Sequence, residues 1–364
     1  MNIGVIFGGR SVEHDISIIT GLQVINGLDK NKYNIVPIYL SKDNYIYCNK
    51  KYKKLENIKK MSTKIGVNSY IKKMRGIASG QSLRKLQKKK KIDLIFNCTH
   101  GAGAEDGILS GMLEFINIPY TSSNILSSSI AQDKDMTKKV LSTIGIPLLD
   151  HIVIKHKDKR NILEMIKDIN YPVIIKPAHL GSSIGIYIAS SKEELLERVK
   201  QAFIYDDKII IEKLLQNFQE FSIAIYKRKN EYHLSKVEVL NRNHDIFSFE
   251  EKYINHHKEV THIYLTNDQL EKELKDYTIK GYELLEMNGI VRFDYLYCDN
   301  NLYLNEINTI PGGLSNYLFK DQISFKLLLD EQIREALYMH KKKNELLKSY
   351  ESNVLKNNNI SFKK

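Results

Sequence analysis

The sequence has no tryptophan, only three cysteines and only six prolines among its 364 residues. Cys48, Cys98 and Cys298 lie far apart and form no Cys-x-x-Cys pair, which argues against a zinc ribbon and against a disulfide framework. No apolar run reaches the roughly 18 residues of a membrane-spanning helix, and the start MNIGVIFGGR lacks a basic segment before a long apolar one. We therefore expect a cytoplasmic protein without a membrane partner.

Two common nucleotide-binding fingerprints are also missing. FGGRS, at residues 7–11, is not a Gly-x-Gly-x-x-Gly, and no acid follows at the distance that a dinucleotide site requires. The Gly- and Ser-rich stretch at residues 181–185 lacks the Gly-Lys-Ser/Thr of a Walker A loop. These absences argue against a dinucleotide-dependent oxidoreductase and against a P-loop NTPase.

The composition is that of a globular protein, with 42% hydrophobic and 27% charged residues, and the length allows two or three domains with cores of their own. The net charge is +12, and much of the excess lies in residues 50–91 and 341–364. Basic patches can bind phosphate backbones, but these runs lack interleaved aromatic residues and match no nucleic-acid motif. Nucleic acid is therefore not an expected partner.

Strands and helices alternate in the first third of the chain, which predicts a parallel α/β layer. Residues 3–9, 33–40 and 92–101 read as strands and 11–28 as a helix. Further on we expect helices at 129–145, 191–203, 268–289 and 325–340, and strands at 171–178, 208–215, 219–229 and 231–240. The predicted fold class is α/β, with an α+β second half.

Two strand-like runs within GIVRFDYLYCDNNLYLNEIN, at residues 289–308, predict a β-hairpin. A polar turn at residues 299–301 joins them, and folding about its centre brings Asp294 opposite Glu306. Because side chains alternate between the two faces of a strand, Leu304 is expected on the same face as Glu306.

The same alternation collects polar side chains on one face of this hairpin. Arg292 and Asp294 share a face of the first strand, and Glu306 and Asn308 share a face of the second. Carboxylate and amide oxygens are hard ligands that suit Mg²⁺. From the hairpin alone, a solvated face with a cross-strand ion pair explains the pattern equally well.

Several further residues are candidate ligand contacts. Lys176 ends a strand just before Gly181–Gly185, where glycines, hydroxyls and N–H groups could surround phosphate oxygens. Lys134, early on its helix, would by itself be an ordinary solvated lysine. Glu212 ends an apolar strand and Glu220 follows it; such acids could accept from ribose hydroxyls, while the backbone of Lys213–Leu215 could contact an adenine edge.

Two residues are expected at the carboxyl edge of the parallel sheet, where open α/β sheets bind ligands. His100 follows the strand at 92–101 and could bind a substrate carboxylate. Glu13 follows the first strand, although it could equally be an ordinary first-turn helix acid. The three histidines in HHKEVTH, at residues 256–262, fit no metal signature, so a polar loop is expected there.

Taken in order, these pieces resemble the D-alanine–D-alanine ligase family of the ATP-grasp superfamily over residues 2–320. The resemblance rests on eight stretches: GVIFGGRSVEHDIS, HGAGAEDG, PYTSSNILSSSIAQDKDMTKKVLSTIGIP, YPVIIKPAHLGSSIGI, IIIEK followed by EFSIA, FEEKY, GIVRFDY and LNEINTIPGG. It implies an ATP-grasp fold behind an N-terminal Rossmann-like parallel α/β domain. It also implies a peptidoglycan-precursor enzyme that uses ATP to activate a carboxylate as an acyl phosphate, which the amine of a second amino acid then attacks.

The resemblance implies roles around the nucleotide. Two Mg²⁺ ions, with Mn²⁺ as an alternative, would be held by Asp294, Glu306 and Asn308. The phosphates would be contacted by Lys134, Lys176, Lys252 and Ser183 in the loop 181–185. The adenosine end would be bound by Glu212, Lys213, Leu215 and Glu220.

It also implies roles around the two amino acids. Glu13 would bind the ammonium of the first, linked through Ser182 to Tyr253 on a closing loop, and His100 would lie near its carboxylate. Arg292 and the N–H of Gly312 would stabilise the oxyanion of the tetrahedral intermediate. Tyr253 favours a dipeptide over a depsipeptide product, because depsipeptide ligases replace that Lys-Tyr loop.

The sequence departs from the family pattern in two places. Ala104 stands where the family usually has Gly. Tyr317, followed by Leu318, stands where the family has the Ser that holds the carboxylate of the second substrate; either the Tyr317 hydroxyl or Ser315 could replace it. We therefore expect an altered acceptor specificity, with D-lactate, D-serine or another amino acid as alternative second substrates.

The expected division is an N-terminal domain at 1–122, a central ATP-grasp subdomain at 123–212 and a C-terminal subdomain with the metal site at 213–340. A basic, frayed tail is expected at 341–364. The resemblance further implies a homodimer.

Overall fold

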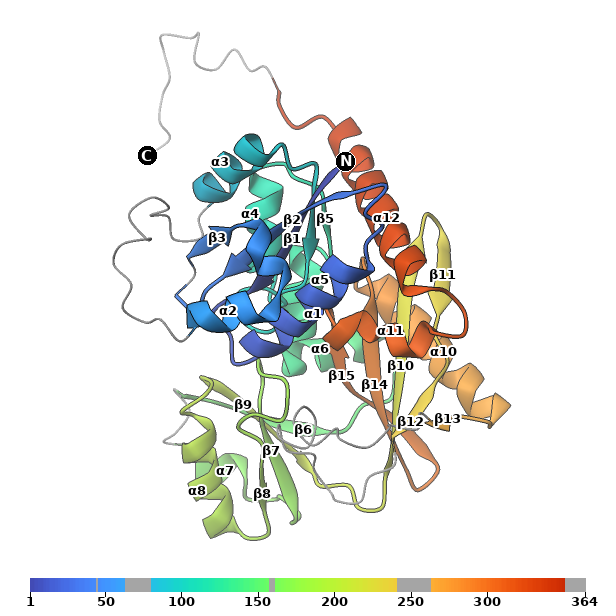
Figure 1. The fold of residues 1–364 in the computed structure, drawn as a ribbon. Helices are drawn as coiled ribbons and strands as arrows, with labels where there is room; N and C mark the ends of the chain where they lie inside the picture. Colours follow the sequence, from blue (N-terminus) through green and yellow to red (C-terminus); the bar gives the residue numbers. More distant parts are fainter. Residues whose placement is uncertain (44, 63–79, 157–160, 241–262, 351–364) are drawn as a thin grey trace, which may run out of the picture.

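The computed structural model describes residues 1–43, 45–62, 80–156, 161–240 and 263–350 (Figure 1). Three β-sheets follow one another along the chain, and each has helices packed on it. No helix in this part of the chain is both long and apolar enough to cross a membrane.

The first sheet is parallel except for one edge strand. Its order is β3 (Ile46–Cys48), β2 (Asn34–Leu40), β1 (Asn2–Gly8), β4 (Leu94–Asn97) and β5 (Tyr120–Thr121), with only β3 antiparallel to its neighbour. The predicted parallel layer is confirmed, although β4 is shorter than the expected 92–101.

Both faces of this sheet are covered because β1 is apolar on both. Ile3, Val5 and Phe7 pack in one core with α1 (His14–Gly27) and α12 (Phe325–Glu345). Ile6 packs on the opposite face in a core shared with α3 (Gly80–Lys90) and α4 (Ile108–Phe115). A short helix, α2 (Leu55–Ser62), lies beyond β3. A near-continuous apolar run is what a doubly covered parallel strand requires.

The middle sheet is antiparallel, in the order β6 (His151–Lys155), β9 (Lys208–Lys213), β7 (Val173–Pro177) and β8 (Tyr187–Ala189). Helices α7 (Ile162–Met165) and α8 (Lys192–Ala202) pack on it. The Ser191 hydroxyl accepts from the Glu194 N–H at 3.2 Å, so Ser191 is the N-cap that begins α8.

The third sheet has the order β13 (Ile263–Tyr264), β12 (Glu238–Leu240), β10 (Gln219–Arg228), β14 (Val291–Cys298) and β15 (Asn301–Asn308), with β11 (Glu231–Leu234) also on β10. Helix α10 (Asp268–Leu284) covers one face; it ends at Leu284, short of the expected 289. The antiparallel strands expected at 219–229 and 231–240 are confirmed, the second as two separate strands.

The hairpin predicted at residues 289–308 is confirmed, and Asp294 lies opposite Glu306. Asp299 and Asn300 form the turn with φ of 51° and 62°, the left-handed conformation that Asn and Asp tolerate in tight hairpins. The expectation for Leu304 is wrong. A β-bulge after Asp294 pairs Leu304 with Tyr295 in the core, on the face opposite Glu306.

The helix expected at 129–145 is two helices, α5 (Ile125–Gln132) and α6 (Lys134–Leu141). Asp133 breaks the run because its carboxylate accepts from the N–H groups of Asp135 and Met136, at 3.1 and 3.2 Å. This cap places Lys134 at the first position of α6. The core of α5 and α6 is shared with the third sheet, not with the middle one.

The C-terminal part of the described chain returns to the first sheet. After the short helix α11 (Asn316–Phe319), α12 packs on α1 and β4 and continues to Glu345. Residues 341–345, expected to be frayed, are therefore helical. Lys343 of this last turn pairs with Glu114 at 2.5 Å. The division at residues 122 and 212 stays a prediction.

Candidate functional site

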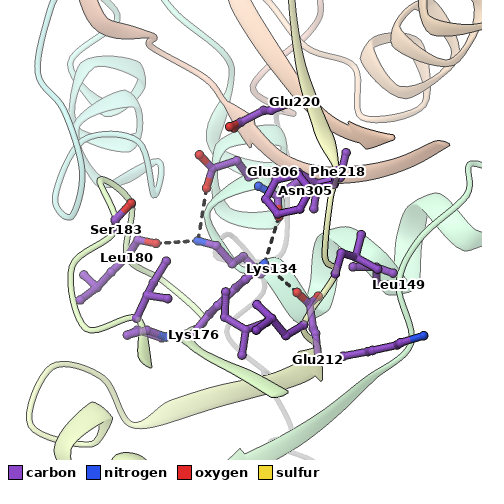
Figure 2. Close-up of a pocket in the computed structure, with 18 residues that line it drawn as sticks. Lys134, Leu149, Lys176, Leu180, Ser183, Glu212, Phe218, Glu220, Asn305 and Glu306 are labelled. Atoms are coloured by element: carbon purple, nitrogen blue, oxygen red, sulfur yellow. Dashed lines mark hydrogen bonds and ion pairs between the residues drawn. The ribbon is translucent and has the colours of Figure 1, made fainter. Parts of the chain in front are cut away.

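A pocket lies between the middle and third sheets (Figure 2). Its walls come from α6, β7, β9, β10, β14, β15 and the loops after β7 and β9. The sequence-predicted residues that line it are Lys134, Lys176, Ser183, Glu212, Lys213, Leu215, Glu220 and Glu306. Residues from five elements, up to 172 positions apart in the sequence, are thereby brought to one cavity.

A buried carboxylate between two lysines forms the floor of this pocket. Glu212 is 2% exposed; its Oε2 lies 2.7 Å from Lys176 Nζ and its Oε1 lies 2.6 Å from Lys138 Nζ. Burial alone would raise the pKa of Glu212, but the ammonium groups of Lys176 and Lys138 lower it to about 2. The cluster therefore carries a net positive charge, which suits a polyphosphate.

Two further contacts direct lysines across the pocket. Lys176 Nζ also donates to Asn305 Oδ1 at 3.0 Å, where Asn305 is the extra residue of the bulge in β15. Lys134 Nζ donates to the carbonyl of Leu180 at 2.5 Å and lies 3.9 Å from Glu306 Oε2 (Figure 2). Both predicted phosphate-binding lysines thus face the acidic hairpin.

Asp294 is the most heavily hydrogen-bonded of the three predicted metal ligands. Arg292 donates to both of its oxygens, each at 2.8 Å; Ser222 Oγ adds a bond at 2.6 Å and Asn308 Nδ2 one at 2.8 Å. Two donors per oxygen use the acceptor capacity of a carboxylate in full. Asp294, Asn308 and Glu306 therefore do share one face, and Glu306 is the member on the pocket wall.

The Gly- and Ser-rich loop after β7 closes one side of the pocket. Ser182 and Ser183 have φ of 54° and 59°, and Gly185 has 74°. Consecutive left-handed residues of this kind turn backbone N–H groups into an anion-binding concavity. Ser182 Oγ donates to the carboxylate of Glu13, so the predicted pair is present and joins this loop to the first domain.

His100 lies 4% exposed behind the site, where its Nε2 is 2.9 Å from Thr20 Oγ1. Burial, followed by the nearby Arg292 charge, lowers the pKa of His100 to about 4, so the imidazole is neutral at pH 7. Thr20 Oγ1 in turn accepts from the N–H of Gly313 at 3.1 Å. Thr20 thereby connects His100 to the turn that carries Gly312.

Glu105 is a buried acid that the sequence reasoning left out. It accepts from the N–H groups of Gly101 at 2.7 Å and Ile310 at 3.0 Å, and so ties the His100 loop to the end of β15. Burial, and then the neighbouring Glu13 carboxylate, raise the pKa of Glu105 to about 8. At pH 7 Glu105 is therefore mostly protonated.

The turn after β15 holds the residues that depart from the family pattern. Gly313, Leu314 and Ser315 follow Gly312 with φ of 56°, 54° and 48°, a strained left-handed turn of the kind found at functional sites. Ser315 is fully buried. Leu318, at 1% exposed, belongs to the core of the first sheet, so its predicted substrate contact stays a prediction.

Tyr317 is also largely buried, and burial raises the pKa of its phenol. Its hydroxyl is hydrogen-bonded to Glu238, and the Arg292 charge lies close by. Of the two replacements considered for the missing Ser, Tyr317 is therefore the one directed toward the Arg292 and Asp294 cluster. Lys252 and Tyr253 lie outside the described residues.

One of the residues missed by the sequence reasoning had a signal. Lys138 is four positions after Lys134, so the two share a face of α6, and a second lysine on that face could have been expected at the same ligand. Ser222, Thr20 and Asn305 had no comparable signal, because their roles depend on pairings between distant segments.

Two family models match the chain. The one described as "D-ala D-ala ligase N-terminus" matches residues 2–123, and the one described as "D-ala D-ala ligase C-terminus" matches residues 140–326. Among curated proteins, the D-alanine--D-alanine ligase of Thermosipho melanesiensis is 35% identical, over 98% of each chain.

Solved structures agree with this result. The D-alanine--D-alanine ligase of Bacillus anthracis complexed with ATP is 27% identical with a TM-score of 0.69, covering 94% of this chain and 99% of its own. The VanG D-Ala:D-Ser ligase of Enterococcus faecalis is also 27% identical, with a TM-score of 0.74, covering 92% and 99%.

We expect Lys138→Met to destabilise the protein by about 3–5 kcal/mol, because it removes one of the two cations that neutralise a buried carboxylate. Lys139→Met is the matched control: that side chain is 59% exposed and pairs with Asp135, so its loss should cost about 0–1 kcal/mol. Urea unfolding measures both. Equal unfolding midpoints for the two variants would contradict the buried ion-pair assignment.

Proposed function

We propose a residue-level mechanism for this chain, which belongs to the D-alanine–D-alanine ligase family and is an ATP-dependent D-alanine–D-alanine ligase. The observation that supports it most directly is the pocket in which Lys134, Lys176 and the loop 181–185 face the acids of the β14–β15 hairpin. Cations and N–H groups on one side and carboxylates on the other are what a triphosphate with its metal ions requires.

In the first step, a carboxylate oxygen of one D-alanine attacks the γ-phosphorus of ATP, and ADP leaves. The product is an acyl phosphate, which turns an unreactive carboxylate into an electrophile. We assign Lys134, Lys176 and the N–H groups of residues 181–185 to the phosphates; Glu220 and the backbone of Lys213–Leu215 would take the adenosine end. Most of the catalytic effect is positioning and charge stabilisation.

Glu212 fits a different task from the ribose contact suggested by the sequence. Both of its oxygens are occupied by lysine ammonium groups at 2.6 and 2.7 Å. We propose that it mainly fixes Lys176 toward the phosphates, and that Glu220 takes the larger share of the ribose contact.

The acids of the hairpin fit Mg²⁺ by donor chemistry, since two carboxylates and an amide lie on one face. Asp294, Glu306 and Asn308 would hold the ions; bound there, the ions would neutralise the charge on the transferring phosphoryl group. Because Asp294 already accepts four hydrogen bonds, binding a cation requires that it give up at least one. A flip of the Asn308 amide would remove one of these bonds and turn its oxygen toward the ion.

In the second step, the amine of the second D-alanine attacks the acyl carbon, the C–O bond to phosphate breaks, and the dipeptide forms. Arg292 and the N–H of Gly312 are assigned to the oxyanion of the tetrahedral intermediate. Glu13 would bind the ammonium of the first D-alanine, and the hydrogen bond from Ser182 would hold the Glu13 carboxylate in place. His100 would lie near the substrate carboxylate as a neutral imidazole, which adds no charge there.

The acceptor site is proposed to admit amino acids other than D-alanine. Tyr317 replaces a small Ser of the family pattern, and a phenol bound to Glu238 near Arg292 changes both the shape and the polarity at the acceptor carboxylate. The structural similarity to a ligase named for D-Ala:D-Ser makes D-serine the first alternative to test.

A cytoplasmic location is proposed because the reaction consumes ATP and because the three cysteines are free thiols.

A homodimer is proposed through α4 and α5. Their exposed apolar side chains are Ile108, Phe115, Ile125 and Leu126, and Phe115 is 87% exposed. Exposed apolar side chains that gather on neighbouring helices often mark a protein–protein interface.

Glu306→Gln should lower turnover by about two orders of magnitude or more with the fold retained, since it removes a negative charge from the proposed metal site. Phosphate release from ATP and D-alanine measures this effect, and circular dichroism checks the fold. Glu283→Gln, an exposed position on α10, is the control and should leave turnover unchanged. A near-normal rate for Glu306→Gln would remove Glu306 from the metal site.

Mixtures of D-alanine with D-serine or D-lactate should give mixed products beside D-alanyl-D-alanine, identified by mass spectrometry. Tyr317→Ser, which restores the family residue, should lower the mixed fraction several-fold. If D-alanyl-D-alanine is the sole product in every mixture, the proposal that the acceptor site admits other substrates is wrong.

Phe115→Glu should convert a dimer into a monomer in sedimentation velocity, because it places a charge in an apolar interface. Ile204→Glu, at another exposed apolar position after α8, should leave the dimer intact. A wild-type protein that sediments at its monomer mass of 42.2 kDa would refute the dimer.

A further inference from the structure

Three successive backbone carbonyls that lead into the phosphate-binding loop are held by the junction of α5 and α6. The N–H of Lys134 donates to the carbonyl of Ala178 at 3.0 Å, the side-chain amide of Gln132 donates to that of His179, and Lys134 Nζ donates to that of Leu180 at 2.5 Å. The loop at 181–185 begins directly after this segment. Its starting point is therefore set by the helix that also carries Lys134.

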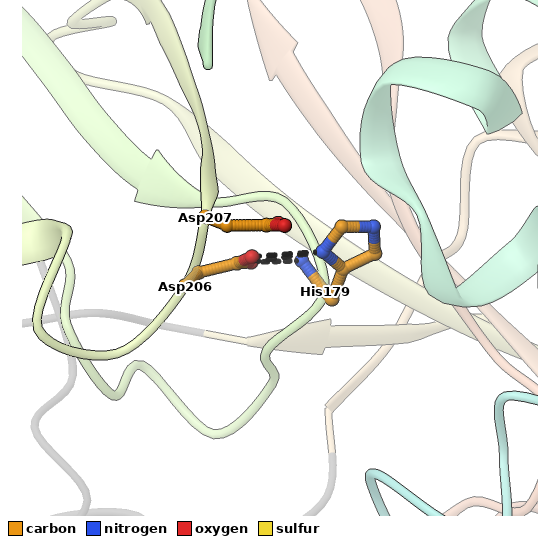
Figure 3. A group of neighbouring side chains, drawn as sticks. All are labelled: His179, Asp206 and Asp207. Atoms are coloured by element: carbon orange, nitrogen blue, oxygen red, sulfur yellow. Dashed lines mark hydrogen bonds and ion pairs between the residues drawn. The ribbon is translucent and has the colours of Figure 1, made fainter. Parts of the chain in front are cut away.

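His179 contacts the carboxylates of Asp206 and Asp133. Figure 3 shows the contact with Asp206. The backbone N–H of His179 donates to Asp206 Oδ2 at 2.7 Å, and the imidazole Nδ1 of His179 lies 2.9 Å from Asp206 Oδ1. Its Nε2 lies 3.4 Å from Asp133 Oδ2, on the residue that caps α6. An imidazole can donate from both ring nitrogens only when it is protonated. The geometry is thus that of an imidazolium joining Asp133 to Asp206.

The charged groups around His179 come from three elements. Asp133 faces it from the start of α6, and Asp206 and Asp207 face it from the segment before β9. Lys208, on β9, lies 2.8 Å from the Asp133 carboxylate and 2.6 Å from that of Asp135. The bonds to Asp133 and then to Asp206 raise the pKa of His179 to about 9.

His179, Asp206 and Asp207 are also close enough to share a metal ion (Figure 3). The hydrogen bond between Nδ1 and Asp206 argues for a proton instead, because a metal-binding imidazole must give up the proton at the ligating nitrogen. Asp133 is already neutralised by Lys208, which further lowers the attraction for a cation.

We propose that His179 is a positioning residue for ATP: its imidazolium ties the entry of the phosphate-binding loop to the N-terminus of α6, so that the loop and Lys134 approach the phosphates as one unit. The proposal rests on the assignment of this pocket to ATP. His179 itself lines no part of the pocket wall and acts through Leu180 and Lys134.

The proposal has a defined pH dependence. His179 has a raised pKa in the folded protein, so its contacts are fully present below its ordinary value near 6.5 and are lost as the pH rises through about 9. The loop should then loosen, and the KM for ATP should rise at alkaline pH. The KM for D-alanine and kcat at saturating ATP should respond much less.

The experiment measures kcat, KM for ATP and KM for D-alanine between pH 6.5 and 9.5, for the wild type, His179→Asn and His179→Lys. Asn at position 179 should raise KM for ATP about tenfold at pH 7.5, a loss on the scale of one charge-assisted hydrogen bond, and remove the alkaline rise. Lys at this position keeps a positive charge to higher pH, so it should restore part of the affinity and delay the rise. His340→Asn, on α12, is the control.

Histidine NMR provides a second readout. The resonance lost in His179→Asn should titrate near pH 9 in the wild type and nearer 6.5 in Asp206→Asn, which removes the charge while keeping an acceptor. If His179→Asn does not fold, Asp206→Asn alone must show the raised KM for ATP.

An unchanged KM for ATP in these variants, or an alkaline rise shared by wild type and His179→Asn, would overturn the proposal. A wild-type protein that forms no dipeptide would instead overturn the assignment of the pocket, so the two failures are distinguishable.

Discussion

The Glu212 carboxylate between Lys138 and Lys176 is the interaction on which the site depends. It is a buried charge at the meeting point of α6, β7 and β9, and its burial is tolerated only because two cations complete it. Each partner belongs to a different element. The ion pairs therefore hold α6, which packs on the third sheet, in a fixed position relative to β7 and β9 of the middle sheet. If Lys176 turned away from the pocket, the Glu212 carboxylate would lose one of its two cations.

Lys176, one of the two cations beside Glu212, also contacts the bulge in β15. Lys176 Nζ reaches Asn305, the extra residue of the bulge, at 3.0 Å. Without the bulge, strict alternation would direct Asn305 to the face opposite Glu306, away from the lysine. The bulge instead lets Asn305 and Glu306 both line the pocket while Leu304 packs in the core. The extra residue of the bulge thus allows β15 to present polar side chains to the pocket and an apolar side chain to the core.

The hairpin itself could be predicted from the sequence because its cause is local: a polar turn lies between two β-rich runs. The turn at Asp299 and Asn300 sets the pairing of Tyr295 with Leu304 and would by itself pair Asp294 with Asn305. The extra residue of the bulge is what puts Asp294 opposite Glu306. The strands of the first sheet were equally accessible, since doubly covered strands are apolar without interruption. The bulge was not, because it is stabilised by Lys176, some 130 positions away. The break at Asp133 had a visible cap, but helical periodicity on both sides concealed it.

Roles were harder to predict than elements, and the reason is electrostatic. Glu212 was recognised as an acid at a strand end, yet its task depends on which cations surround it, and one of these, Lys138, reads as an ordinary helical lysine. The same holds for His100: a histidine after a parallel strand suggests a ligand contact, but only its burial beside Arg292 shows that it is neutral. A sequence motif specifies which groups are available, whereas burial and neighbouring charges decide their protonation. For this site the decisive charges come from segments that meet only in the folded chain.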